Sequence, residues 1–425
     1  MFTSYQHVTA HLDGLGMFHM DLTLERMRTA LSRLGLQHPP FAVVQVVGTN
    51  GKGSTSTFLA SVAKAHGLRT GLYTSPHFVF PEERIRIDGL PLSRDIWPRL
   101  GNAVMEAEPN LTYFEFLTVL AVLAFAESGV ELAVMEAGLG GRWDATTAAH
   151  ADLLCVTPIA MDHEAVLGAT LHAIAADKAD ALRDGEPLVT GPQEADALHA
   201  LEAAAHARHT SLCAAATLAP LPESAPLGLC GPHQRHNAQL ALGAWRELAR
   251  RRGWKSDAQK EAQGLRDAFL PGRFQRCPAA HGLPPLLLDG AHNPHGMRAL
   301  RRAVDSTGIA PSAVIFSCLA DKDMASLLPD LRAIAGTAPV FTPTIQHNQR
   351  AALSTFIAAQ YGPTARPASD LPAALRMATA LRMAAEAGAR QGDGPMLICG
   401  SLYLLGEFFT LYPEYLISPR HGEVA

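Results

Sequence analysis

The sequence predicts an α/β fold with two domains, a larger one built on a mostly parallel sheet and a smaller one after it. The chain has 425 residues, more than a single domain usually holds. Short apolar runs alternate with helix-like segments, an order typical of parallel strands joined by helices. The alternation restarts near Pro284. We therefore expect a first domain at 1–275, a linker at 276–282 and a second domain at 283–425.

The composition indicates a packed globular enzyme of the cytoplasm. The chain is 48% hydrophobic and 18% charged, with a formal net charge of -5. That charge gives no reason to expect a nucleic-acid or membrane partner. The six cysteines form no C-x-x-C pair, which indicates reduced thiols rather than disulfides or a zinc site. We see no signal peptide and no apolar stretch long enough to span a bilayer.

The first elements in order are helices within 1–40 and a buried strand at 41–47. The strand leads into a glycine-rich turn at 48–54 that surrounds Lys52. Glycines let the backbone approach an anion, lysine adds a full charge, and the next helix, expected at 57–66, adds a partial one. The turn differs from a Walker A box in the spacing of its glycines and hydroxyl. Strand, turn and helix together still predict a phosphate-binding loop.

Three further strands are expected to end in polar residues: 71–74 before Ser75, 131–135 before Glu136, and 151–159 before His163. Parallel strands deliver such ends to one edge of a sheet, where the ligands of open α/β sheets bind. An apolar helix is expected at 111–128, ahead of the second of these strands. Glu136 stands before a glycine turn, which makes it a suitable metal-binding carboxylate.

The later segments continue the alternation of strands and helices. Helical spacing surrounds Lys178, and another helix is expected to contain Asn237. In the second domain, strands at 285–288 and 313–318 flank a helix at 297–306. The second domain is therefore also predicted to be α/β.

Ten short motifs, taken in order, carry a resemblance to a known family. They are G-T-N-G-K-G-S at 48–54, S-P-H at 75–77, L-T-Y-F-E at 111–115, M-E-A-G-L-G-G-R-W-D-A-T at 135–146, D-H at 162–163, H-Q-R-H-N-A at 233–238, P-G-R at 271–273, D-G-A-H-N-P at 289–294, A-D-K-D at 320–323 and G-S-L-Y-L at 400–404. Together they resemble the folylpolyglutamate synthase/dihydrofolate synthase family of the Mur ligase superfamily, over nearly the entire chain. Each motif alone is only suggestive, whereas the ordered set is specific.

The resemblance implies a fold and an activity. The fold would be an N-terminal P-loop-type ATPase domain of the Mur-ligase type, carrying the folate or pteroate site, and a Rossmann-like C-terminal glutamate-ligase domain. The activity would couple ATP cleavage to amide formation. A carboxylate on dihydropteroate or a reduced folate attacks the γ-phosphorus, and the amino group of L-glutamate then displaces phosphate. A monomer is implied. Cations and backbone N–H groups must neutralise charge, because both reacting groups are anionic.

Matching positions imply the contacts to both substrates. The ATP-binding residues would be Thr49, Asn50, Gly51, Lys52, Gly53, Ser54, Asn237, Arg273, Asp289 and His292. The pteroate or folate contacts would be Asp21, Leu22, Thr23, Thr112, Glu115, Arg142, Trp143 and Asp144.

The resemblance also implies two Mg²⁺ sites. Ser54 and Glu136 would bind the first ion, and Ser75, Glu136 and His163 the second. Two metal ions suit a transfer between two anions. A K⁺ ion is also compatible with the resemblance.

The catalytic residues by resemblance are Lys52, His163 and Lys178, with Lys178 carbamylated by CO2. Family members commonly have E-K-A-G at this lysine, whereas this chain has D-K-A-D at 177–180. Asp180 would therefore place a negative charge near the carbamate.

Other readings stay open from the residues. The enzyme could act as a folylpolyglutamate synthase only. A Mur-type ligase of peptidoglycan precursors would carry a nucleotide-sugar-binding domain before the phosphate loop, and a loop beginning at Gly48 leaves no room for one. A P-loop NTPase that binds a partner protein would turn over ATP without glutamate, and it gives no role to the motif at 289–294.

Overall fold

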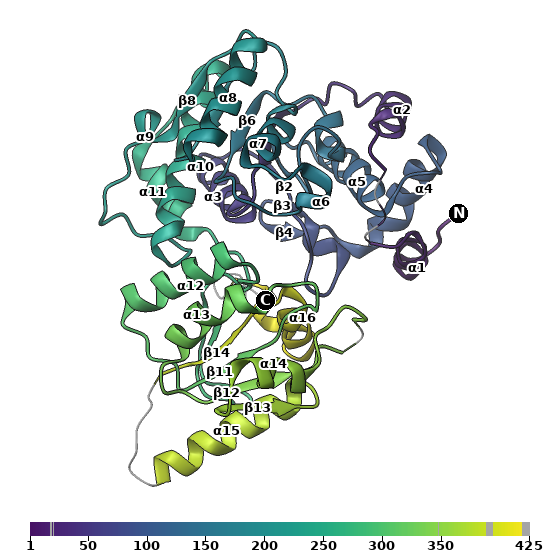
Figure 1. The fold of residues 1–425 in the computed structure, drawn as a ribbon. Coiled ribbons are helices and arrows are strands. Elements are labelled where there is room, and N and C mark those ends of the chain that lie inside the picture. Colours follow the sequence, from purple (N-terminus) through teal and green to yellow (C-terminus); the bar gives the residue numbers. More distant parts are fainter. Residues whose placement is uncertain (18, 20, 347, 388–393, 419–425) are drawn as a thin grey trace. The chain divides into compact units, whose positions relative to one another are not determined.

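The computed structural model describes residues 1–17, 19, 21–346, 348–387 and 394–418 (Figure 1). The chain forms two compact units. The first holds Met1–Gly228 and Arg235–Ala268, and the second holds Leu229–Gln234 and Phe269–Ala425. The main division thus falls before residue 275, and a strand of the second unit reaches into the expected linker. Both units are α/β, so the predicted fold class is confirmed.

The first unit is built on an eight-stranded sheet in the order β4-β3-β2-β5-β1-β6-β7-β8. Its strands are β1 (Ala42–Val47), β2 (Thr70–Tyr73), β3 (Ile85–Ile87), β4 (Leu90–Pro91), β5 (Leu132–Glu136), β6 (Leu153–Val156), β7 (Leu188–Thr190) and β8 (Leu212–Ala214). All neighbouring pairs are parallel except those that β3 makes with β2 and β4. The sheet is therefore mostly parallel, as the sequence predicted, with a hairpin at one edge.

Helices cover both faces of this sheet. They are α1 (Tyr5–Leu15), α2 (Glu25–Arg33), α3 (Lys52–Ala65), α4 (Trp97–Ala107), α5 (Tyr113–Glu127), α6 (Glu164–Leu167), α7 (Leu171–Ala179), α8 (Ala195–Ala207), α9 (Ala215–Leu218), α10 (Pro232–Arg252) and α11 (Ala258–Asp267), with 3-10 turns η1 (Pro81–Arg84), η2 (Arg94–Ile96) and η3 (Ala145–Ala148). One core joins α1, α2, α4 and α5 to β1, β2 and β5. Figure 1 shows α10 and α11 beside α3, away from that core.

The helix after the phosphate loop begins at Lys52, so the predicted start at residue 57 was wrong. The glycine-rich stretch resembles a long turn, but only its early part is one. Gly51 adopts a φ of 91°, and the residues after it form the first helical turn. Gly48 is required for close approach, since a Cβ there would lie 1.9 Å from Thr157 Oγ1. The first N–H groups of α3 are thus left available to a ligand.

The second unit has a six-stranded sheet in the order β13-β12-β11-β14-β10-β9. Its elements are β9 (Gln275–Cys277), β10 (Leu286–Leu288), α12 (Pro294–Thr307), β11 (Ala313–Phe316), α13 (Met324–Ala335), β12 (Val340–Pro343), α14 (Ser354–Tyr361), β13 (Ala365–Ala368), α15 (Leu371–Ala387), β14 (Met396–Cys399), α16 (Leu402–Leu411) and η4 (Pro413–Leu416). Only β9 is antiparallel to its neighbour. Among the described residues, no helix combines the length and the apolar character that crossing a bilayer requires.

Candidate active site

Four parallel strands bring their carboxyl ends to one edge of the first sheet. β1 lies between β5 and β6, and β2 lies beyond β5. The register pairs Val46 with Glu136 and Val47 with Val156, so the phosphate loop begins beside both neighbouring strand ends. The strands that follow β1 in the chain lie on both sides of it, so the strand order reverses at β1. Open α/β sheets bind their ligands at such a point.

A cavity at this edge unites predicted residues that are far apart in the sequence. We call it the phosphate cavity. Its lining is Gly48, Thr49, Lys52, Gly138, Leu139, Gly140, Asp162, His163, Leu167 and Lys178. The predicted residues Thr49, Lys52, His163 and Lys178 therefore share one surface. Three other predicted residues of the same loop lie outside this lining. Gly51 is the N-cap of α3, and Gly53 and Ser54 belong to its first turn.

Hydrogen bonds fix the phosphate loop to the segment after β6. The N–H groups of Thr49 and Asn50 donate to the carbonyl of Pro158, at 3.1 and 3.3 Å. The Thr49 hydroxyl donates to the carbonyl of Ala160 and accepts from its N–H, both at 3.1 Å. Lys52 Nζ donates to the carbonyl of Gly48 at 3.2 Å, which holds the ammonium over the loop. The Lys52 ammonium and the N-terminus of α3 therefore lie on the same side of the phosphate loop.

Glu136 ends β5 and Ser75 follows the neighbouring strand β2, whereas His163 lies in the segment after β6, on the other side of β1. Glu136 is buried, and its Oε2 accepts a hydrogen bond from the N–H of Ser75 at 3.1 Å. His163 has a left-handed φ of 52°, uncommon for a residue with a side chain, and it begins the short helix α6. Within the described parts of the chain, no three His, Cys, Asp or Glu side chains gather as a metal site. Mg²⁺ is usually bound by one or two carboxylates together with water and substrate phosphates, and Glu136 is a buried carboxylate at this edge of the sheet.

The loop that carries Ser75 is held by a carboxylate that the sequence analysis did not single out. Glu83 is buried and accepts three backbone hydrogen bonds, from the N–H groups of Phe78, Val79 and Phe80 at 2.9, 2.7 and 2.7 Å. Arg84 Nε donates to His77 Nδ1 at 2.9 Å. Burial lowers the pKa of His77 to about 3, and the Arg84 charge adds to this, so His77 stays neutral and can accept that bond.

The change Glu83→Gln should loosen this loop. The amide nitrogen would replace one accepting oxygen and leave a backbone donor without a partner. We expect a loss of about 1–3 kcal/mol in the free energy of unfolding. Urea denaturation would measure the loss, and hydrogen exchange should quicken at Phe78–Phe80. The exposed Glu106→Gln is the matched control. Equal stability of the two variants would contradict a role for Glu83 in holding the loop.

Lys178 is buried beside the phosphate loop. Burial and, after it, the neighbouring Lys52 charge lower its pKa from 10.5 to about 7. Lys178 lies close to the glycine turn after β5, since a Cβ on Gly141 would be 2.5 Å from the Lys178 carbonyl oxygen. Asp177 accepts from the Gly141 N–H at 3.0 Å and so joins α7 to the same turn. With a pKa of about 7, a substantial fraction of Lys178 is the neutral amine near pH 7, and the neutral amine is a nucleophile.

Asp180 does not stand as an isolated negative charge beside Lys178. Its Oδ2 lies 2.8 Å from Arg142 Nε, and both side chains are partly exposed. The D-K-A-D sequence therefore comes with an arginine that balances its second carboxylate. This pairing could not be read from the motif, because the two residues lie on different segments.

Asp144 organises the turn after β5 and does not face solvent. Its Oδ2 accepts from the N–H groups of Gly138 and Leu139 at 2.8 and 3.0 Å. Its Oδ1 accepts from the N–H and the hydroxyl of Thr146. Burial raises the pKa of Asp144, and these hydrogen bonds oppose the rise. The structure thus places Asp144 beneath the phosphate cavity, where it holds the lining turn.

Two of the predicted pteroate contacts, Asp21 and Glu115, meet at Arg26. The Arg26 guanidinium lies 2.9 Å from Asp21 Oδ2 and donates to both carboxylate oxygens of buried Glu115, at 3.1 and 3.2 Å. Thr112 caps α5, its hydroxyl accepting from the N–H of Glu115. The Thr23 hydroxyl accepts from a backbone N–H at the start of α2. Arg26 was missed because a charged residue on an amphipathic helix is typical of a solvated face.

Two large apolar side chains remain exposed among these residues. Leu22 is 60% exposed and Trp143 is 44% exposed. The guanidinium of Arg142 lies 5.9 Å from the ring of Trp143. Exposed apolar groups beside charged ones can mark a binding surface for a planar ligand.

The remaining predicted nucleotide contacts divide between the two units. In the first unit, Asn237 is buried and adjoins the phosphate loop, since a Cβ on Gly51 would lie 2.5 Å from its Oδ1. In the second unit, Asp289 follows β10 and accepts from the N–H groups of Phe274 and Ala291, both at 2.9 Å. Burial raises the pKa of Asp289, while the Arg273 charge opposes this. His292 Nδ1 contacts the Gly290 carbonyl at 2.8 Å, so these residues form one cluster.

The chain is similar to several known proteins in sequence and in fold. Residues 272–402 match the family described as "Mur ligase, glutamate ligase domain". The chain is 32% identical to the dihydrofolate synthase/folylpolyglutamate synthase of Mycobacterium tuberculosis, over 92% of this chain and 90% of that protein. It is 30% identical to a probable bifunctional folylpolyglutamate synthase/dihydropteroate synthase of Haloferax volcanii, over 98% of this chain but 51% of that longer protein. A solved structure of E. coli FolC in complex with DHPP and ADP superposes with a TM-score of 0.82 and 27% identity, covering 97% of this chain and 98% of that one.

Proposed function

The chain belongs to the folylpolyglutamate synthase/dihydrofolate synthase family, and on this premise we propose that it ligates L-glutamate to two kinds of acceptor. With dihydropteroate the product is dihydrofolate, and with reduced folates it is a folate polyglutamate. ATP is the co-substrate. The observation that carries the proposal is the phosphate cavity, where Thr49, Lys52, His163 and Lys178 line one surface at the carboxyl edge of a parallel sheet.

The reaction has two steps. An oxygen of the acceptor carboxylate attacks the γ-phosphorus, the bond to the bridging oxygen breaks, and ADP leaves with that electron pair. The amine of glutamate then attacks the acyl phosphate carbon, phosphate leaves, and the nitrogen loses a proton. The Lys52 ammonium and the first N–H groups of α3 lower the barrier by holding negative charge on the phosphates.

The residues present fit two Mg²⁺ ions. Ser54 and Glu136 would hold one, and Ser75, Glu136 and His163 the other. Buried Glu136 already adjoins Ser75 through its backbone bond, and hydroxyl and carboxylate oxygens are the hard ligands that Mg²⁺ prefers. Bound Mg²⁺ supplies charge neutralisation of the triphosphate and the acyl phosphate. A K⁺ ion near the same phosphates is a further part of this proposal.

The change Glu136→Gln should raise the Mg²⁺ concentration needed for half-maximal activity by about tenfold or more. Glu136 is the only carboxylate among the proposed ligands, so the loss of its charge should weaken Mg²⁺ binding strongly. The measurement is a Mg²⁺ titration of ADP release at saturating ATP. The change keeps the size of the side chain and its ability to accept from the Ser75 N–H. An unaltered Mg²⁺ requirement would exclude Glu136 as a ligand.

We further propose that Lys178 is carbamylated. Its neutral amine attacks the carbon of CO2 and loses a proton, so that the amine becomes an anionic carbamate. Such a group can position ligands beside Lys52. The pairing of Asp180 with Arg142 offsets part of the repulsion that the D-K-A-D motif would otherwise bring.

The substrate contacts outside the phosphate cavity are also proposals. Asn237, Arg273, Asp289 and His292 would bind the nucleoside and its phosphates. Leu22 and Trp143 would pack against the pterin, while Asp21, Thr23, Thr112, Glu115, Arg142 and Asp144 shape that surface directly or through Arg26. We propose a first domain at 1–275, a linker at 276–282 and a glutamate-ligase domain at 283–425. We also propose a cytoplasmic monomer without nucleic-acid or membrane partners.

One assay tests the function. Purified protein is incubated with MgATP and labelled glutamate, with either dihydropteroate or tetrahydrofolate, and the products are resolved by mass. We expect one glutamate added to dihydropteroate and further glutamates added to the folate. Product from the folate alone would restrict the enzyme to polyglutamate synthesis. ATP turnover that is independent of glutamate would overturn the proposal in favour of another NTPase.

A further inference from the structure

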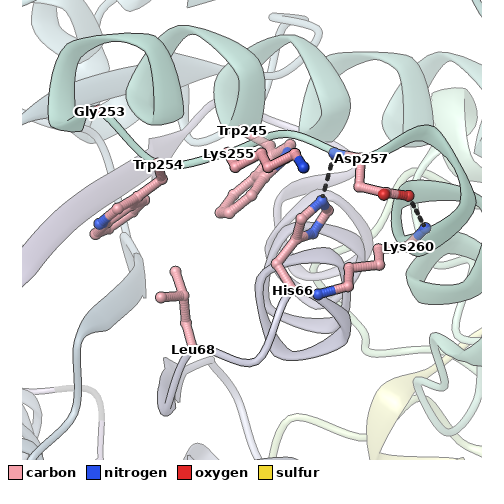
Figure 2. Close-up of a pocket in the computed structure, with 8 residues that line it drawn as sticks. All are labelled: His66, Leu68, Trp245, Gly253, Trp254, Lys255, Asp257 and Lys260. Carbon is pink, nitrogen blue, oxygen red and sulfur yellow. Dashed lines mark hydrogen bonds between the residues drawn. The ribbon is translucent and has the colours of Figure 1, made fainter.

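A second cavity lies at the other end of α3 from the phosphate loop, within the first unit. Its volume is about 370 Å³, and its lining is His66, Leu68, Trp245, Gly253, Trp254, Lys255, Asp257 and Lys260. Figure 2 shows these side chains around a common space between the end of α3 and the segment joining α10 to α11. We call it the indole cavity. The helix has 14 residues, so the two cavities are separated by about 20 Å.

The indole cavity has an ordered aromatic wall. The rings of Trp245 and Trp254 stack at 21° with centroids 6.0 Å apart, and the His66 ring lies 4.4 Å from that of Trp245. Trp245 is fully buried, whereas Trp254 is only partly buried and can offer a face to a ligand. Leu68 adds an apolar contact. Such a wall accepts a flat aromatic ring by offset stacking.

Hydrogen bonds hold the polar part of the wall in place. His66 Nε2 accepts from the N–H of Asp257 at 3.0 Å, as Figure 2 shows, so the ring proton is on Nδ1 and donates to the Val62 carbonyl at 2.8 Å. The Asp257 carboxylate accepts from the N–H groups of Gln259 and Lys260 and so caps α11. His66 and Asp257 are therefore engaged in shaping the cavity.

The two lysines give the cavity its positive charge. Lys255 and Lys260 are exposed, and neither forms an ion pair among the residues that the structure describes. The arginines at the end of α10 differ, because each of the three lies against a carboxylate: Arg250 and Arg251 against Glu247, and Arg252 against Asp152. With Asp257 counted, the lining retains one net positive charge.

We propose that the indole cavity binds a small planar aromatic carboxylate. The ring stacks on Trp254 and contacts Leu68, and the carboxylate lies between the ammonium groups of Lys255 and Lys260. The volume suits a bicyclic ring, since ligand pockets begin at about 300 Å³. This site is separate from the proposed ligase chemistry and does not depend on it.

The probe is naphthoate, with naphthalenemethanol as its uncharged counterpart. Protein labelled with fluorotryptophan has four signals, one for each tryptophan, and Trp254→Phe assigns the relevant one. We expect naphthoate to shift the Trp254 signal in a saturable manner and naphthalenemethanol to bind about fivefold more weakly. Added salt should weaken the binding of naphthoate but not that of naphthalenemethanol, because the exposed lysines are screened by salt. Saturating ADP should leave the dissociation constant unchanged.

Variants separate this site from the surface around Trp143. Trp254→Leu should raise the dissociation constant about tenfold, and Lys260→Gln about threefold. Lys64→Gln, near the end of α3 but outside the cavity lining, should have no effect. Because Lys260 is exposed, its variant remains informative if Trp254→Leu folds poorly. Shifts confined to the Trp143 signal, or equal binding of the charged and uncharged probes, would overturn the proposal.

Discussion

The variant Lys52→Ala is expected to lose at least about a thousandfold in the rate of glutamate ligation. Lys52 provides the full positive charge of the phosphate loop, with its ammonium 3.2 Å from the Gly48 carbonyl oxygen and its own N–H in the first turn of α3. Removing it leaves the γ-phosphate without that charge while an anionic carboxylate approaches. The rate should be measured as ADP release and as labelled product, each at saturating substrates.

The matched control is Lys64→Ala, near the opposite end of the same helix. Lys64 is exposed and donates to the Asp88 carbonyl at 2.6 Å, so its loss should leave the rate nearly unchanged. The two variants separate an effect on the reaction from a general effect of removing a lysine from α3. A Lys52→Ala enzyme with near-normal turnover would refute the phosphate-binding role of this loop.

The variant Lys178→Ala is expected to lose about a hundredfold or more in rate, and added acetate should restore part of it. In the proposal, the carbamate of Lys178 is an anion held in a buried place, and a small carboxylate can enter the space that alanine leaves. A propylammonium salt of the same concentration is the control, since it fills the space with the opposite charge. Full activity of Lys178→Ala without any addition would show that no carbamate is needed.

The pKa of Lys178 fixes the direction of the pH effect on the modification. Only the neutral amine reacts with CO2, and burial sets its pKa at about 7 in the folded protein. Carbamylation should therefore increase as the pH rises through about 7, instead of requiring the much higher pH of an exposed lysine. Labelled bicarbonate followed by carbon NMR would measure it. In Lys52→Ala the neighbouring charge is absent, so the same transition should move to higher pH.

The sequence by itself determined the α/β class and the position of the phosphate loop. An apolar run that enters a glycine turn is a local signal, and the strand predicted at 41–47 is β1, Ala42–Val47. The strand ends before Ser75 and Glu136 were also predictable, because parallel strands share one edge. The start of α3 could not be predicted, since the glycines at 48–53 are compatible both with a turn and with the first turn of a helix.

Only the tertiary structure decided which charged side chains are buried and what they hold. Glu83 stands in a run of charged residues that would ordinarily be exposed. It is nevertheless buried, and three backbone N–H groups donate to its carboxylate. Arg26 joins Asp21 to Glu115, which lies 89 positions away in the chain. The indole cavity likewise needs His66 beside Trp245. Hydrophobic periodicity is a local property of the sequence, whereas the burial of a charge depends on partners that only the folded chain brings together.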